Sequence, residues 1–198
     1  MPTSEYPNGI KSISPALARS GYAGSSSKPF STLKGLNQIR NSPIITPMAQ
    51  SLAKILVHTV FSTKDRRPLL RDNILREELH RYLGGILTNL DCQPVIIGGV
   101  EDHVHLLCAL SRTINAAEMV KEVKRGSSLW IKTRGQELPD FAWQNGYGIF
   151  SIGFSQIESV RKYIAEQEEH HRKISFQDEF RQLLKRYELE FDERYAWD

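Results

Sequence analysis

Two histidines, His103 and His105, lie two residues apart within an apolar run that favours a β-strand. Alternate side chains of a strand point to the same face, so the two imidazoles are expected to project together. Imidazole is a common ligand of divalent metals, and two of them side by side make half of a metal site. The same spacing also occurs in strands that bind no metal, so it indicates a site only in combination with other residues.

A phenol and an amide, Tyr163 and Gln167, lie four residues apart in a segment expected to be helical over residues 156–171. This spacing puts both side chains on one helical face, beside an apolar stripe. The stripe consists of Ile157, Val160 and Ile164. The pair could present a nucleophile and a metal ligand to one phosphate. The alternative is a half-buried structural tyrosine next to a surface glutamine.

The elements that must position these side chains follow from hydrophobic periodicity and turn residues. Strands are expected at residues 55–61, 94–100, 103–110 and 143–154. Helices are expected to begin at Asp72 or Asn73 and at Asn115, with Ile74 and Leu129 on their apolar faces. The order strand, helix, hairpin, helix, strand predicts an α+β, ferredoxin-like βαββαβ fold, an antiparallel sheet with helices on one face, followed by the tyrosine-bearing helix.

Composition divides the chain of 198 residues into three parts. Residues 1–47 hold six of the nine prolines and many serines, and are expected to be a disordered lead. This lead is interpreted as sequence upstream of a true start at Met48, with an organelle transit peptide as the alternative. Residues 48–175 are expected to form the main domain, and residues 176–198 a last helix, beginning after Ser175, with an acidic tail.

The net charge of +3 comes from the lead, because the rest of the chain holds 21 basic and 22 acidic residues. Any affinity for nucleic acid must therefore come from local clusters. Cys92 and Cys108 lie in or beside apolar strands without metal-binding spacing and are expected to be reduced core residues. The sequence shows no apolar run long enough to span a membrane and no secretory signal, so a soluble, cytoplasmic protein is expected.

Taken together, the motifs resemble the insertion-sequence-200-like transposases, a family of single-tyrosine nucleases named for a His-hydrophobic-His motif. The resemblance spans residues 49 to about 180. It is carried by segments 56–64, 102–107, 143–148 and 160–167, by His170 and His171, and by Lys124, Ser127, Ser128 and Trp130 on the second helix. The 47-residue lead departs from the family pattern.

This resemblance implies that His103, His105 and Gln167 bind Mg²⁺ or Mn²⁺, and that Tyr163 attacks a phosphate in single-stranded DNA. The products would be a 5′-phosphotyrosine and a free 3′ hydroxyl, with no small-molecule cofactor beyond the metal. The resemblance also implies DNA hairpins as substrate, action at the nucleoid, and a homodimer in which the tyrosine helix of one subunit can complete the metal site of the other. An exposed edge on the first strand would suit such a dimer.

Several further residues could take part in the site or in DNA binding. Lys124 and Arg125 are candidates for phosphate contacts and Tyr147 for base stacking, although a solvated helix face and a packed aromatic explain them equally well. The other histidines remain possible ligands or neighbours of ligands: His58, His80, His170 and His171. Two other functions stay open, a domesticated or catalytically silent DNA-binding relative and a metal-dependent phosphodiesterase that uses water.

Overall fold

The computed structural model describes residues 52–135 and 138–193, so the predictions for residues 1–47 lie outside the described residues. The elements are β1 (Ile55–Ser62), α1 (Asn73–Asn89), β2 (Gln93–Gly99), β3 (His103–Leu110), α2 (Ala116–Ile131), β4 (Gly148–Ile152), α3 (Ile157–Ala165), α4 (Gln167–His171) and α5 (Phe176–Arg186). Short 3₁₀ turns occupy Lys64–Arg66 and Phe154–Gln156. Within these ranges, no helix combines the length and the apolar character that crossing a bilayer requires.

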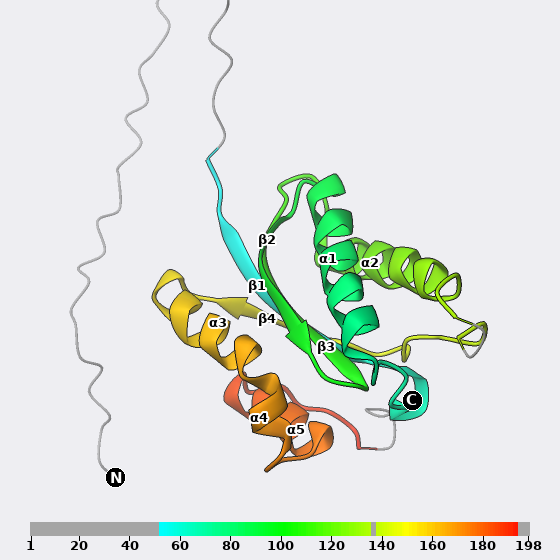
Figure 1. Ribbon diagram of the computed structural model, residues 1–198. Helices are drawn as coiled ribbons and strands as arrows, with labels where there is room; N and C mark the ends of the chain where they lie inside the picture. Colours follow the sequence, from blue (N-terminus) through cyan, green and yellow to red (C-terminus); the bar gives the residue numbers. More distant parts are fainter. Residues whose placement is uncertain (1–51, 136–137, 194–198) are drawn as a thin grey trace, which may run out of the picture. The chain divides into compact units, whose positions relative to one another are not determined.

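The four strands form one antiparallel sheet in the order β2-β3-β1-β4, which confirms the ferredoxin-like arrangement (Figure 1). β1 lies in the interior of the sheet and pairs with β3 on one side and β4 on the other. The prediction of an exposed edge on the first strand is therefore wrong, because both sides of β1 are already hydrogen-bonded. The edges of this sheet are β2 and β4.

Helices cover both faces of the sheet, with α1 and α2 on one side and α3 to α5 on the other (Figure 1). The larger core fills the α1/α2 side, where Val104, Leu106 and Cys108 of β3 are buried with apolar residues of both helices. The alternate residues of β3 face α3 and α5, as Leu107 does against Ile164. His103 and His105 share this alternation with Leu107, so the strand register places them on the side that α3 to α5 cover.

The helix starts follow the predicted caps. Asp72 accepts hydrogen bonds from the first turn of α1, Asn115 accepts one from Glu118 N–H, and Ser175 accepts one from Asp178 N–H. Two predicted core positions are wrong: Ile74 is 71% exposed and Leu129 is 58% exposed. Ile74 is two residues from buried Arg76 and Leu129 two residues from buried Ser127 and Ile131, a rotation of about 200° that turns each away from these buried positions.

The last strand is shorter than the predicted range of 143–154. β4 begins at Gly148, and Trp143 makes only an isolated bridge with Thr63. Between them, Lys124 Nζ lies 2.6–3.2 Å from the carbonyl oxygens of Gln144, Asn145 and Gly146. These carbonyls bind an ammonium group rather than a neighbouring strand. The prediction for the cysteines agrees with the structure, where both are buried free thiols.

Candidate metal and tyrosine site

The two histidines of β3 are fully buried, and each has one ring nitrogen held by a neighbour. His103 Nδ1 lies 2.6 Å from Asp102 Oδ1, and His105 Nδ1 lies 3.0 Å from His58 Nε2. These contacts fix the ring orientations and leave both Nε2 atoms facing the same space. Burial lowers the pKa of His105 to about 4, and burial together with His105 lowers the pKa of His58 to about 3. These shifts favour the neutral rings of His105 and His58 at pH 7, and the neutral form is the one that binds metals.

The tyrosine segment is not the single helix predicted over residues 156–171. A 3₁₀ turn precedes α3, and Glu166, with φ −98° and ψ 17°, separates α3 from α4. Tyr163 nevertheless points its ring at the edge of His105, with ring centroids 5.7 Å apart. Gln167 is 1% exposed, and its Oε1 lies 3.4 Å from His103 Nε2. The structure thus brings all four predicted residues together within one chain.

α3 can approach the sheet closely because β2 presents a glycine to it. An added Cβ on Gly98 would lie 2.6 Å from the carbonyl oxygen of Ile164 and 2.9 Å from its Cγ2 atom. Gly98 is also the residue of β2 that pairs with His105. The small residue therefore sets the distance between the tyrosine helix and the histidine strand.

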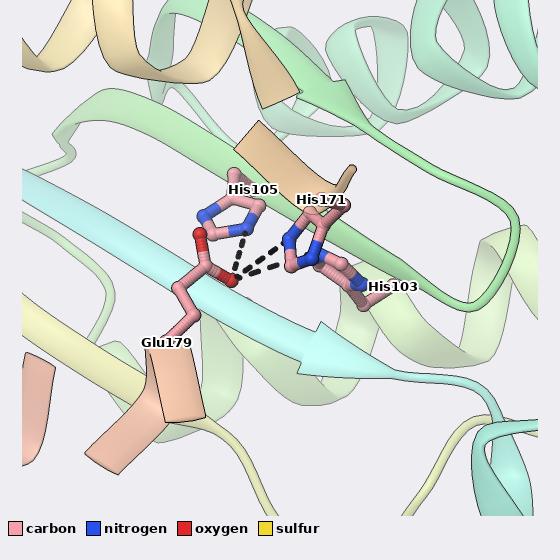
Figure 2. Close-up of side chains that lie close together, drawn as sticks. All are labelled: His103, His105, His171 and Glu179. Carbon is pink, nitrogen blue, oxygen red and sulfur yellow. Dashed lines mark hydrogen bonds and ion pairs between the residues drawn. The ribbon is translucent and has the colours of Figure 1, made fainter. Parts of the chain in front are cut away.

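A carboxylate from α5 lies at the centre of the cluster. Glu179 is 2% exposed, and its Oε1 accepts hydrogen bonds from the Tyr163 hydroxyl and from Gln167 Nε2, the latter at 2.9 Å. Its Oε2 lies 3.2 Å from His171 Nε2, 3.5 Å from His105 Nε2 and 3.7 Å from His103 Nε2 (Figure 2).

Glu179 is not among the site residues predicted from the sequence. One signal was present, since an acidic residue interrupts the apolar stripe of Phe176, Phe180, Leu183 and Leu184. An acid in a buried stripe needs a partner.

Four residues of this cluster could hold a metal ion: His103, His105, His171 and Glu179. Their ligand atoms all lie within 4.8 Å of one another. His105 Nε2 is buried without a hydrogen-bond partner among the described residues, which suits an atom that would bind a metal. The residues present therefore fit a divalent ion. Two other candidate histidines are not among these four residues. His170 Nε2 lies 3.6 Å from Glu179 Oε1, and His80 belongs to α1.

The charges in the cluster favour a protonated tyrosine beside an ionised glutamate. Burial raises the pKa of Tyr163 well above its ordinary value near 10, and the adjacent Glu179 carboxylate raises it further. Burial alone would raise the pKa of Glu179, but the facing imidazoles, His105 and His171 first, hold it well below the usual range. The tyrosine hydroxyl thus donates a hydrogen bond to an ionised carboxylate and keeps its proton in this arrangement.

The three predicted DNA-contact residues lie elsewhere. Lys124 Nζ, besides its three carbonyl contacts, lies 5.5 Å from the centre of the Tyr147 ring, and burial lowers its pKa to about 8. Arg125 pairs with Glu122 on the exposed side of α2, and Tyr147 is 39% exposed. No contact found among the described residues joins these three to the histidine cluster. Lys124 is therefore engaged in holding the loop before β4.

Comparison with known proteins identifies the family of the chain. A family model described as Transposase IS200 like matches residues 51–167. Among solved structures, a candidate transposase from Deinococcus radiodurans R1 is 20% identical with a TM-score of 0.48, the match covering 62% of this chain and 98% of that one. A REP-associated tyrosine transposase bound to a REP hairpin is 12% identical with a TM-score of 0.47, covering 66% and 76%. No curated protein matches. Because the family model matches more than half of its length, the chain belongs to the IS200-like transposase family.

Proposed function

We propose that this transposase cleaves and rejoins single-stranded DNA with Tyr163 as the nucleophile and a divalent metal bound by His103, His105 and Gln167. One observation carries the proposal besides family membership. The Tyr163 hydroxyl contacts one oxygen of Glu179, while the Nε2 atoms of His103 and His105 face the other. The two oxygens of a carboxylate span about the same distance as two oxygens of a phosphate. A nucleophile and a metal site that share one carboxylate can therefore also share one phosphate.

The chemistry follows from these positions. The Tyr163 oxygen forms a bond to the phosphorus, and the bond from phosphorus to the 3′ oxygen of the leaving strand breaks. The Tyr163 proton passes to solvent, and the leaving 3′ oxygen takes up a proton from solvent to become a free hydroxyl. A bound Mg²⁺ or Mn²⁺ would supply Lewis-acid stabilisation of the phosphate charge. Attack of a 3′ hydroxyl on the phosphotyrosine reverses the same steps, so rejoining needs no ATP.

The substrate and assembly are proposed from the family alone. We propose DNA hairpins at the ends of an element as substrate, a homodimer, and action at the nucleoid in the cytoplasm. In the structure, Tyr163 and Gln167 reach the histidines of their own chain. A homodimer that extends the sheet would have to use β2 or β4, because β1 is in the interior. Tyr147, which is partly exposed, and Arg125 remain proposals for DNA contact, and Lys124 would first have to release its carbonyls.

The test is formation of a covalent protein–DNA adduct. Purified protein is incubated with labelled single-stranded hairpin DNA and Mg²⁺ or Mn²⁺, and an SDS-resistant adduct is sought by gel electrophoresis. We expect an adduct that is lost in Tyr163→Phe and kept in Tyr82→Phe, a matched control on the exposed surface of α1. Cleavage without an adduct would instead favour a phosphodiesterase that uses water, and binding without cleavage a silent DNA-binding relative.

A further inference from the structure

We propose that His171 and Glu179 are direct ligands of the metal in addition to His103, His105 and Gln167, so that the centre includes three imidazoles and a carboxylate and prefers a transition metal ion to Mg²⁺. Both residues lie beyond the segment that matches the family model, residues 51–167. The inference rests on the metal site of the proposed function and extends it to α5. It also assigns a role to the buried acid on that helix.

The orientations of the three imidazoles support this centre. The Nδ1 atoms of His103 and His105 face Asp102 and His58, and His171 Nδ1 lies 3.0 Å from the carbonyl oxygen of Ile174. A carbonyl oxygen only accepts hydrogen bonds, so His171 Nδ1 is the donor there. Each imidazole is thus held at Nδ1, and the three Nε2 atoms converge on Glu179 Oε2. Imidazoles held at one nitrogen with the other directed inward are typical of metal sites.

The distances distinguish a shared ion from direct hydrogen bonds. A charge-assisted hydrogen bond between nitrogen and a carboxylate oxygen is about 2.7–2.9 Å long. Ligands about 2.1 Å from one metal ion lie about 3.0–3.5 Å apart in octahedral or tetrahedral geometry. The three distances to Glu179 Oε2 are 3.2, 3.5 and 3.7 Å. The 3.2 Å contact of His171 is itself a hydrogen bond, whereas the 3.5 and 3.7 Å distances of His105 and His103 are too long for direct hydrogen bonds and lie near the second range.

The charge of Glu179 leads to the same conclusion. Glu179 is 2% exposed, and its Oε2 faces three ring nitrogens, of which His105 Nε2 has no hydrogen-bond partner among the described residues. A divalent cation between these atoms would satisfy all of them at once. Mg²⁺ favours oxygen ligands and keeps several waters, whereas imidazoles suit transition metals. We therefore expect Mn²⁺ or Zn²⁺ to bind more tightly than Mg²⁺.

The experiment measures metal binding without DNA. Metal-free full-length protein is titrated with Mn²⁺, and free Mn²⁺ is followed by electron paramagnetic resonance. We expect Glu179→Gln and His171→Ala each to weaken binding on the order of tenfold or more, while the matched control Glu190→Gln, an exposed acid, leaves it unchanged. Excess Mg²⁺ should compete poorly. Thermal unfolding of each metal-free variant checks that it folds.

A second measurement counts the nitrogen ligands directly. Pulsed paramagnetic resonance of bound Mn²⁺ should detect three imidazole nitrogens in the unmodified protein and two in His171→Ala. Two nitrogens in the unmodified protein, with normal affinity in Glu179→Gln, would overturn the inference and leave the proposed function intact. Tighter binding in Glu179→Gln would overturn it too, because Glu179 would then fill the site and compete with the metal. If the unmodified protein binds no Mn²⁺, Zn²⁺ or Mg²⁺, the metal site of the proposed function also fails.

Discussion

Replacing Gly98 with alanine would push α3 away from the sheet. The new Cβ would lie 2.6 Å from the Ile164 carbonyl oxygen, whereas ordinary contact begins at 3.4 Å, so the backbone of α3 must withdraw by about 0.8 Å. Tyr163 precedes Ile164 in the chain and must move with it. Overpacking of this kind costs about 1–3 kcal/mol of unfolding free energy. Misplacing a reacting group by about 1 Å can lower a rate about 100-fold.

The assay pairs the rate of adduct formation on hairpin DNA with the free energy of unfolding in urea. We expect Gly98→Ala to form adduct about 10- to 100-fold more slowly under conditions where it is fully folded. Gly85→Ala is the matched control, because an added Cβ there would have no atom within 4 Å. Its position inside α1 predicts a gain of about 0.5–1 kcal/mol and an unchanged rate. A Gly98→Ala protein as fast and as stable as the original would refute the packing argument.

Three further substitutions test separate contacts. Asp102→Asn replaces the carboxylate that orients the His103 ring. The Mn²⁺ affinity, measured by titration, should fall about 10- to 100-fold. Unchanged affinity would mean that the His103 ring does not need this carboxylate to bind the metal. Ser127→Ala leaves the buried Trp143 indole N–H, now 2.9 Å from the serine oxygen, without that acceptor, and should cost about 1–3 kcal/mol in urea unfolding. Burial and then Arg76 lower the pKa of His80 from 6.5 to about 4, so the unfolded chain binds the extra proton and stability should fall as the pH drops from about 6.5 to about 4. His80→Gln should remove up to about 3 kcal/mol of that pH dependence, and an identical pH profile would contradict the assignment.

Local patterns predicted the elements that local chemistry determines. The bounds of β3 follow from an apolar run that only His103 and His105 interrupt. Asp72, Asn115 and Ser175 cap helices through bonds within a few residues. The predicted start of β4 was wrong because Lys124, about twenty residues away, binds the carbonyls that a longer strand would have paired. The side-chain direction of a strand residue is fixed by its position, which is why His103 and His105 could be paired from sequence.

The other part of the site depends on packing between distant segments. Glu179 reaches the histidines because the apolar stripe of α5 docks against Val60 and Phe150 on the same face of the sheet. The spacing of residues within 176–198 does not indicate which face of the sheet this helix packs against. The break between α3 and α4 at Glu166 could not be predicted either, because the helical pattern of the sequence continues through this residue. The sequence did contain an acid among apolar residues. This pattern indicates that the helix buries a charge, but it does not indicate which residues the charge contacts.

The position of α5 in the chain also bears on the order of synthesis. The sheet and α1 to α4 are complete by His171, whereas the carboxylate that contacts both Tyr163 and the imidazoles comes from residue 179. Domains are made from the N-terminus, at about 5–20 residues per second. A chain on the ribosome therefore holds the tyrosine and the two strand histidines before it holds the acid that faces them. Among the described helices, α5 is translated last, and it brings the nucleophile and the candidate metal ligands into contact with a single side chain.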